Sequence, residues 1–309
     1  MQPRVTIMIP TFNQEDFIGE AIESAMAQDY KNIEIIISDD NSQDGTREKV
    51  KKYLLDKRIK YFRNEVNLGR VMNYRKLLNE YSNGDWVVNL DGDDYFSDNE
   101  FISKAINSIK FAEKIGATIV AYLANHRSLQ KIDSKLIIAR LDEHSLVMSG
   151  REYFINYYNI GGFTHMACIY KRDLGIITKI YSCDLVAADF LSIMRLALNG
   201  DFILADYEVG TWRRHSKNVS QTNLKRKYRD NIYVIESLAN DAKDSFEPNE
   251  MELWLNEMRK KNREGYVSDL IFNSEGHQQF RLALQNFKFR YSYFMLLYNL
   301  IKKSISSMK

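Results

Sequence analysis

The most informative stretch of the chain reads G-D-W-V-V-N-L-D-G-D-D, residues 84–94. Its apolar part, Trp86 to Leu90, predicts a short buried strand. Three carboxylates follow within four residues, those of Asp91, Asp93 and Asp94, and they repel one another unless positive charge lies beside them. A divalent cation that also binds a diphosphate would relieve this repulsion. A solvated acidic turn is the alternative, because Gly-Asp is common in turns.

The composition is that of an ordinary globular protein. Of the 309 residues, 45% are hydrophobic and 27% are charged, which allows one large or two small domains with a complete core. The 43 basic and 41 acidic residues give a net charge of +2, which does not favour nucleic acid as a partner. The two cysteines, Cys168 and Cys183, lack metal-site spacing and predict reduced thiols in the cytoplasm.

No stretch of the sequence predicts an export signal or a membrane span. The N-terminus leads directly into a strand-like run. No apolar segment reaches the roughly 18 residues that a spanning helix needs. We therefore expect a cytoplasmic protein, and leave open a peripheral position on the inner face of the cell membrane.

Strands alternate with helices over the first hundred residues. Strands are expected at residues 5–9, 33–37, 59–63 and 86–90, and helices at residues 18–28, 46–55 and 67–81. Pro10 should close the first strand, since a central strand could not contain it. The alternation predicts an α/β fold with a mostly parallel, doubly wound sheet. The polar residues after the first, second and fourth strands should then meet at the carboxyl edge of the sheet.

These polar residues fit a nucleoside diphosphate that is bound through a metal ion. Thr11 and Asn13 follow the first strand, and Asp39 and Asp40 follow the second, where they can accept hydrogen bonds from a base or ribose. The glycine patterns of dinucleotide-binding folds and P-loops are missing from the sequence. We therefore expect a metal rather than a glycine loop to meet the phosphate charge.

Four motifs make the chain resemble the inverting family-2 glycosyltransferases, which have the Rossmann-like GT-A fold. They are I-P-T-F-N-Q-E (residues 9–15), I-S-D-D-N-S-Q-D-G-T (residues 37–46), N-L-G (residues 67–69) and L-D-G-D-D (residues 90–94). Their order and spacing are similar to the family's from residue 4 to about residue 100. The resemblance implies transfer of a hexose or N-acetylhexosamine from a UDP-sugar to a hydroxyl of a growing glycan, such as a lipid-linked precursor of a bacterial polysaccharide.

The resemblance also implies the residues that bind the donor. They are Pro10, Thr11, Phe12, Asn13, Glu15, Asp39, Asp40, Asn73, Arg75, Asp91, Gly92, Arg213 and His215. Asp40 would face the base, and Asp91 and Asp93 would form the family's D-x-D motif. Asp93 would be the direct ligand of Mn²⁺ or Mg²⁺, and Asp91 would also lie near the ribose or diphosphate. For Asn73 and Arg75 a solvated helix face is the alternative.

The second half of the chain is expected to bind the acceptor. Residues 101–115 predict a helix, residues 117–123 a strand, and residues 124–150 a polar, irregular loop region over the site. His165 lies between a predicted helix at residues 151–158 and a predicted strand at residues 166–170. By resemblance it borders the acceptor and the donor sugar; a hydrogen-bonded structural histidine is the alternative.

Transfer with inversion needs a carboxylate that takes the proton of the acceptor hydroxyl. In the family this base opens a helix that reads W-D-L-x-x-R-L, and residues 187–197, A-A-D-F-L-S-I-M-R-L-A, match it. Asp189 therefore stands at the position of the base, while Ala188 replaces the acid that usually precedes it. A helix cap is the alternative for Asp189, and Asp184 is the reserve candidate.

Residues 207–220, Y-E-V-G-T-W-R-R-H-S-K-N-V-S, resemble the family's Y-R-x-H-x-x-N-x-S. Trp212 stands at the tyrosine position, near the acceptor or donor sugar. Arg213 and His215 would bind the departing diphosphate, and His215 would be a further metal ligand. A basic surface loop is the alternative.

Two rival functions have sequence support. The same acidic motif occurs in the haloacid-dehalogenase phosphatases, but Asn89 stands where that family needs its aspartyl nucleophile. A sugar-nucleotide sensor without activity would keep the donor site, and Asp189 argues against it.

Residues 221–309 fall outside the resemblance. Helices are expected at residues 224–243 and 250–263, and residues 280–301 form an apolar seam with basic flanks. The seam would pack on the catalytic domain or a second subunit, or lie on an anionic membrane surface. We thus expect a nucleotide-sugar-binding half at residues 1–100, an acceptor-binding half of the same GT-A domain at residues 101–223, and a helical C-terminal extension at residues 224–309.

Overall fold

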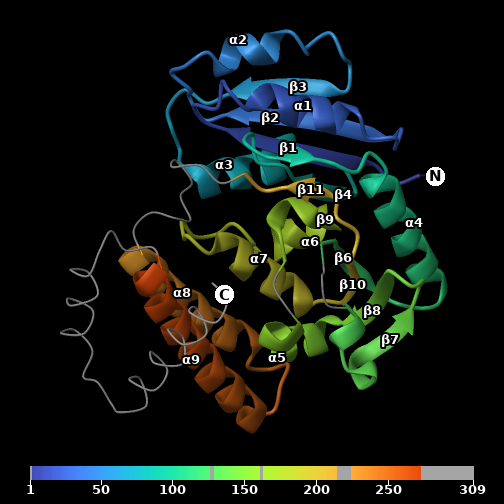
Figure 1. Ribbon diagram of the computed structural model, residues 1–309, viewed down its shortest axis with the longest axis vertical. Coiled ribbons are helices and arrows are strands. Elements are labelled where there is room, and N and C mark those ends of the chain that lie inside the picture. Colours follow the sequence, from blue (N-terminus) through green and yellow to red (C-terminus); the bar gives the residue numbers. More distant parts are fainter. Residues whose placement is uncertain (1, 126–128, 161–162, 214–223, 273–309) are drawn as a thin grey trace, which may run out of the picture. The chain divides into compact units, whose positions relative to one another are not determined.

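A computed structural model describes residues 2–125, 129–160, 163–213 and 224–272 of the chain. The chain forms two compact units, Met1–His215 and Ser216–Lys309. Among its described residues, the second unit consists of the helices α8 (Leu224–Ala242) and α9 (Pro248–Phe272), which pack against each other (Figure 1).

The described part of the first unit contains a nine-stranded sheet with the order β3-β2-β1-β4-β9-β6-β10-β8-β7. Its strands are β1 (Val5–Thr11), β2 (Ile33–Asp39), β3 (Ile59–Arg63), β4 (Trp86–Asn89), β6 (Ile119–Leu123), β7 (Ile137–Arg140), β8 (Ser145–Ser149), β9 (Cys168–Lys171) and β10 (Asp201–Ala205). Within this sheet β8 and β9 run opposite to the other strands. The sheet is therefore mostly parallel, as the alternation predicts.

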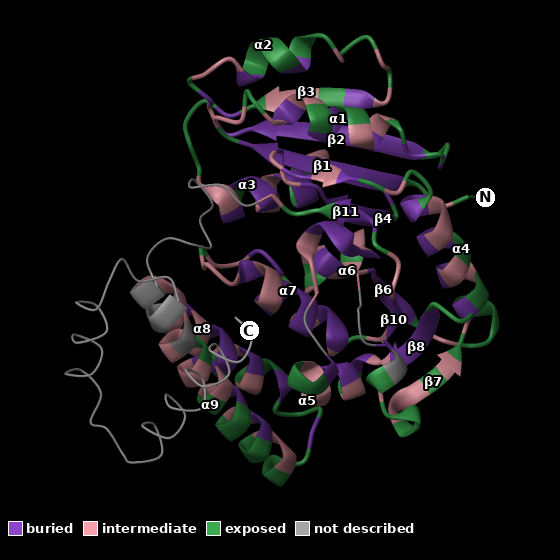
Figure 2. Ribbon diagram, in the orientation of Figure 1, coloured by how far each residue is buried: buried purple, intermediate pink, exposed green. Residues whose placement is uncertain are grey.

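Helices cover both faces of the sheet. The helices α1 (Ile18–Met26), α2 (Thr46–Lys51) and α4 (Phe101–Lys114) share one apolar core with the odd-numbered residues of β1 and β2. On the other face α3 (Arg70–Lys76) and a π-helical turn, Leu77–Tyr81, contact β1, and α5 (Gly150–Ile160), α6 (Arg172–Ile177) and α7 (Ala188–Ala197) contact one another and the strands beyond β4. Figure 2 shows β1, β2 and β4 buried between these layers.

A second, two-stranded sheet joins distant parts of the unit. The strand β5 (Tyr95–Phe96) follows the acidic turn directly, and β11 (Gly210–Thr211) pairs with it in antiparallel orientation. This pairing brings Trp212 and Arg213 next to residues 91–94.

Pro10 lies inside β1, so the expectation that it ends the first strand is wrong. It pairs with Ser38 of β2, while the pairing of β1 with β4 ends at Met8 and Asn89. The Pro10 carbonyl accepts a hydrogen bond from the N–H of Gly92 (3.1 Å). Because N–H and C=O of a strand residue point to the same side, the missing N–H faces the turn after β4, where no ladder bond is lost.

The expected irregular region at residues 124–150 is also wrong, because it contains the antiparallel pair β7 and β8. The side chains of Leu146, Val147 and Met148 are fully buried, and β8 pairs with β10. This short apolar run forms an inner strand of the sheet, and β7 covers it as the edge strand. The other expected elements of residues 1–213 are present with shifted ends.

A buried carboxylate fixes the start of β4. Glu34 on β2 accepts hydrogen bonds from the Thr6 hydroxyl (2.7 Å) and from the N–H of Asn83 (2.6 Å). Thr6 in turn accepts the N–H of Gly84 (2.9 Å). Arg4 and Lys60 each lie 3.4 Å from the Glu34 carboxylate, which balances its buried charge. These bonds set where β4 begins and, four residues later, where the acidic turn lies.

We predict that Gly84→Ala destabilises the first unit. A methyl group at this position would lie 2.6 Å from the N atom of Thr6 and 2.6 Å from the O atom of Trp86, and backbone atoms in a sheet cannot move aside without cost. We expect a loss of about 1–3 kcal/mol in the free energy of unfolding, measured by urea denaturation.

Gly265→Ala is the matched control. Nothing lies within 4 Å of the added methyl group in α9, so this variant should gain about 0.5–1 kcal/mol. Equal stabilities of the Gly84 variant and the wild type would show that the contact between β4 and β1 is looser than described.

Candidate active site

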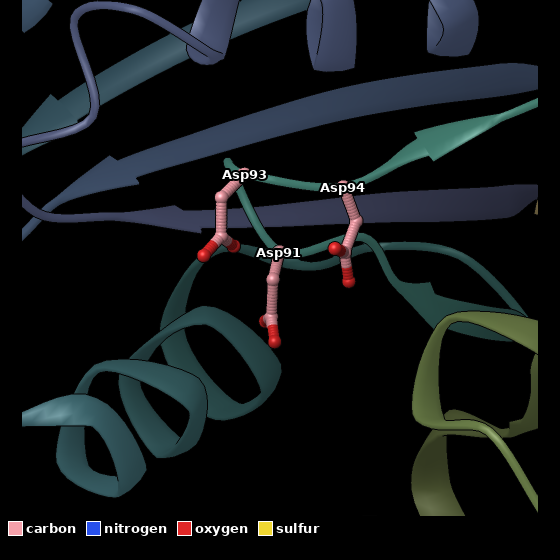
Figure 3. A group of neighbouring side chains, drawn as sticks. All are labelled: Asp91, Asp93 and Asp94. Carbon is pink, nitrogen blue, oxygen red and sulfur yellow. The ribbon is translucent and has the colours of Figure 1, made fainter. Parts of the chain in front are cut away.

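The acidic turn after β4 brings three carboxylates together. Asp91, Asp93 and Asp94 can each offer an oxygen atom such that the three atoms lie within 4.8 Å of one another. Figure 3 shows the three side chains pointing to the same side of the turn. The N–H of Asp94 donates to the carbonyl of Asp91 (2.8 Å), which closes the turn. A methyl group at Gly92 would lie against the side chains of Gln14, Thr11 and Ile18, so the turn packs closely on the end of β1.

Burial and the charge of neighbouring carboxylates raise the pKa values of two acids in this turn. Burial and the charge of Asp93 raise the pKa of Asp91 to about 6, although the Tyr74 hydroxyl opposes the shift. Burial and the charge of Asp91 raise the pKa of Asp94 to about 8, against a hydrogen bond from the Arg213 N–H. The turn therefore holds protons that free aspartates would lose, and a bound cation would release them.

The loops after β1 and β2 lock each other at the carboxyl edge of the sheet. The N–H of Asn13 donates to the Ser42 hydroxyl (2.9 Å), and its side-chain oxygen accepts the N–H of Gln43 (2.8 Å). The carboxylate of Glu15 accepts the N–H of Gly45 (2.8 Å). The first two polar clusters thus lie side by side, as expected. Thr11 is buried, whereas the ring of Phe12 is 44% exposed beside them.

Asp39 and Asp40 are both buried and hold neighbouring loops. Asp39 accepts hydrogen bonds from the Tyr61 hydroxyl and the N–H of Ser42, both at 2.7 Å. Asp40 accepts the N–H groups of Leu68 and Gly69, both at 2.8 Å, and the side chain of Asn64 at 2.9 Å. Asp40 therefore shapes the loop that opens α3, where Gly69 has a φ of 84°.

Asn73 and Arg75 lie on α3 but not on a solvated face. Asn73 is 2% exposed; its amide donates to the carbonyl of Ser38 (2.9 Å) and its oxygen accepts the Ser38 hydroxyl (2.6 Å). The Nε of Arg75 donates to the carbonyl of Tyr181 (2.7 Å). The alternative of a solvated face is wrong for Asn73, because it packs against the buried β2.

Two further residues of α3, Arg70 and Tyr74, contact the site and were missed in the sequence. The Tyr74 hydroxyl donates to Asp91 (2.7 Å), and the Arg70 guanidinium lies 5.6 Å from the centre of the Tyr74 ring. Arg70 also donates to the carbonyls of Leu185 (3.2 Å) and Val186 (2.9 Å). Their spacing of four residues, which puts two side chains on one helix face, is the signal that could have found them.

His165 is partly exposed and packs against buried tyrosine side chains, of which Tyr74 contacts Asp91. Its Nε2 lies 2.9 Å from the Tyr181 hydroxyl, and its ring packs edge-on to Tyr74 at 5.4 Å between centres. Burial lowers the pKa of His165 to about 4, although Asp189 opposes the shift. The imidazole is therefore neutral at physiological pH and serves as a hydrogen-bonding group.

Asp189 lies in the first turn of α7, on the same side of the sheet as α3. Its carboxylate is close enough to act on the pKa values of Asp91, Arg70 and His165. It also accepts the N–H of Phe190 (2.9 Å), as a helix-start acid can. Asp184, the reserve candidate, is exposed. The fold thus brings the predicted base near the acidic turn, although the two are far apart in the sequence.

Arg213 holds the segment after β11 against the acidic turn. Its N–H donates to Asp94 (2.9 Å) and its guanidinium to the carbonyl of Asp93 (3.3 Å). The guanidinium also pairs with Glu20 and lies 4.7 Å from the centre of the Tyr95 ring. Trp212, next to it, is 41% exposed. His215 and the seam at residues 280–301 lie outside the described residues.

None of the helices that the structure describes is both long enough and apolar enough to cross a membrane.

Sequence comparison relates the chain to curated glycosyltransferases. The GalNAc(5)-diNAcBac-PP-undecaprenol beta-1,3-glucosyltransferase of Campylobacter jejuni is 38% identical over 109 residues, which are 35% of this chain and 33% of the relative. The UDP-Glc:alpha-D-GlcNAc-diphosphoundecaprenol beta-1,3-glucosyltransferase WfaP of Escherichia coli is 38% identical over 109 residues, 35% of this chain and 41% of the relative. The matches thus span less than half the length of these relatives.

Solved structures confirm the expected GT-A fold. Staphylococcus aureus TarS in complex with UDP-GlcNAc superimposes with a TM-score of 0.63 at 18% identity, over 86% of this chain and 79% of that one. The mannosyltransferase PcManGT of Pyrobaculum calidifontis, in complex with GDP-Man and Mn²⁺, gives a TM-score of 0.56 at 15% identity, over 100% and 81% of the two chains.

The family model for glycosyl transferase family 2 matches residues 6–175, which include the four motifs and the acidic turn. This match confirms the family that the motifs predict and excludes the haloacid-dehalogenase alternative. With more than half of its length matched, the chain belongs to glycosyl transferase family 2.

Proposed function

We propose that the protein transfers a sugar from a nucleotide sugar, with inversion and with the help of Mn²⁺ or Mg²⁺, to a hydroxyl of a lipid-linked glycan. The observation that carries this proposal is the placement of the acidic turn and Asp189 at one site of a family-2 fold. The relatives described above act on diphosphoundecaprenol-linked glycans, and the WfaP name includes UDP-Glc. UDP-glucose is therefore the first donor to test, ahead of UDP-N-acetylhexosamines.

The acidic turn fits a divalent cation. Its carboxylate oxygens are the ligands that Mg²⁺ and Mn²⁺ prefer. Burial, and after it the charge of neighbouring aspartates, raises the pKa values of Asp91 and Asp94, and a cation would offset both effects. Asp93 and Asp91 would hold the ion, with His215 as a further ligand, and the Arg213 N–H would keep its bond to Asp94. The ion would neutralise charge on the leaving diphosphate.

The remaining roles follow from position. Asp189 would take the proton of the acceptor hydroxyl while the oxygen of that hydroxyl attacks the anomeric carbon of the donor sugar and the nucleoside diphosphate leaves. Asp40, Asn13 and the exposed ring of Phe12 would hold the nucleoside, while His165 and Trp212 would border the sugars. Residues 1–100 would thus bind the donor and residues 101–223 the acceptor. An acceptor in a membrane would place the enzyme at the cytoplasmic surface, where residues 280–301 would contact either the membrane or another protein surface.

We predict that Asp189→Asn strongly reduces turnover and leaves donor binding intact. The amide keeps the size of the side chain but cannot take a proton, so kcat should fall by about 10²–10⁴-fold. Transfer from UDP-glucose and calorimetric titration with UDP measure the two effects. Asp184→Asn, with its exposed side chain, is the matched control and should keep full activity; the opposite pattern would move the base to Asp184.

We predict that Asp93→Ala removes metal-dependent UDP binding. Without this carboxylate, the affinity for UDP in the presence of Mn²⁺ should fall at least about 10–100-fold, the loss typical even of outer-shell metal partners. Asp173→Ala, at an exposed acid of α6, is the control and should bind as the wild type does. Identical wild-type titrations with Mn²⁺ and with EDTA would contradict the metal role.

We predict that the metal-free protein loses stability as pH rises from 6 to 8.5. The pKa values of Asp91 (about 6) and Asp94 (about 8) lie above the value near 4 of a free aspartate. The folded state therefore binds extra protons, and their contribution to stability is lost as pH rises through these values. Mn²⁺ should raise the melting temperature more at pH 8.5 than at pH 6, because it replaces these protons.

Asp94→Asn tests the source of this pH dependence. An amide at this position can still accept the Arg213 N–H but carries no charge. At pH 8.5 the metal-free variant should be more stable than the wild type by about 1 kcal/mol or more, or roughly 2–4 °C, and the difference should shrink towards pH 6. A melting temperature that does not change with pH in the wild type would argue against the raised pKa values.

A further inference from the structure

Two arginines of α3 hold the segment that leads into α7. We name this segment, Tyr181–Val186, the base tether, because Asp189, the proposed base, lies three residues after its C-terminal end. Arg75 donates to the carbonyl of Tyr181 at one end (2.7 Å). Arg70 donates to the carbonyls of Leu185 (3.2 Å) and Val186 (2.9 Å) at the other. Both arginines bind main-chain oxygens, so they fix the backbone path of the base tether itself.

The helix α7 holds the base tether from the other side. Arg195 of this helix donates to the hydroxyl of Ser182 within the base tether (2.8 Å) and to the carbonyl of Lys179, two residues before the tether begins (2.9 Å). The base tether therefore lies between α3, from the half that would bind the donor, and α7, which bears Asp189. Any shift of α3 relative to α7 would therefore stretch or break these hydrogen bonds.

The position of Arg70 is set by Asp40. The N–H groups of Leu68 and Gly69, directly before Arg70, both donate to the Asp40 carboxylate at 2.8 Å. A chain of contacts thus runs from Asp40 through Arg70 to Val186, and three residues further to Asp189. The Arg70 charge also lies near both Asp91 and Asp189, which together with Tyr74 raise its pKa against the effect of burial.

We propose that Arg70 is a positioning residue, which places Asp189 for proton transfer by holding the C-terminal end of the base tether, with Arg75 holding the other end. The inference rests on the proposed function, in which Asp189 is the base. Arginine suits this task because the two hydrogens of one terminal nitrogen, which here donate to both carbonyls, point in fixed directions within the plane of the guanidinium group, whereas the ammonium group of lysine rotates on a flexible stem. Catalysis is sensitive to such placement: a displacement of about 1 Å can cost about 10²-fold in rate.

The chain contains its own reporter for this idea. Cys183 lies within the base tether and is partly exposed, whereas Cys168, on β9, is buried. The rate at which N-ethylmaleimide alkylates Cys183, read by peptide mass spectrometry, therefore reports on the base tether. Alkylation of Cys168 reports general unfolding. A residue that only stabilised the whole fold would change both rates together.

The test compares Arg70→Lys with the wild type in the full chain, with Mn²⁺ present. We expect kcat with UDP-glucose to fall by about 10–100-fold, the dissociation constant of UDP to change by less than about twofold, and Cys183 to react several-fold faster while Cys168 stays protected. Arg58→Lys is the control: Arg58 pairs with Asp56 (2.7 Å) before β3, and its variant should match the wild type in every measurement.

Two results would overturn the proposal. Unchanged kcat and Cys183 reactivity would show that Arg70 does not hold the base tether, and a weakened UDP affinity as the main effect would make Arg70 a direct donor ligand instead. If Arg70→Lys exposes Cys168, the milder Arg75→Lys decides by the same criteria. A wild type that neither binds nor transfers from any nucleotide sugar would refute the proposed function, whereas the alkylation rates would still test the base tether.

Discussion

Mutual repulsion among Asp91, Asp93 and Asp94 is the constraint on which the rest of the site depends. Placing these carboxylates at the end of a buried strand costs free energy, because burial disfavours their charged forms. The groups that reduce this cost include the Tyr74 hydroxyl, the N–H of Arg213 and the charges of Arg70 and Arg213. A turn that served only to reverse the chain would not need three acids, so the cost itself indicates a binding function.

The constraint also explains why distant parts of the chain meet here. Tyr74 comes from the helix before β4, and Arg213 from the segment after β11, whose pairing with β5 carries it back to the turn. Glu34 fixes the beginning of the same strand from β2. Glu34 acts just before the four-residue strand β4, and Tyr74 and Arg213 act on the turn after it. The position of the carboxylates is therefore determined from both ends of the strand.

The sequence predicted what local patterns encode. The apolar runs and polar clusters located β1 to β4 and the acidic turn, because a strand followed by a loop leaves a signal in a few neighbouring residues. Side-chain direction depends on helix phase and packing, which motif matching ignores. Asn73 and Arg75 were selected by their place near a motif, but Asn73 faces β2, whereas Arg70 and Tyr74 face the site. Pro10 was misjudged because its tolerance depends on where the neighbouring strand ends.

Several residues that are predicted to contact the donor also hold the fold together. Substituting such a residue therefore changes both ligand binding and structure. Asp40 accepts hydrogen bonds from Asn64, Leu68 and Gly69, and a carboxylate has about four such positions. Its substitution would move α3 even if no donor were bound, and Arg70 would move with it. Loss of activity on changing Asp40 would therefore mix a lost donor contact with a displaced base. Arg70 and Asp189 lie further along the same chain of contacts and are not proposed to bind the donor. Substitutions at these two residues can therefore separate the effect on proton transfer from the effect on donor binding.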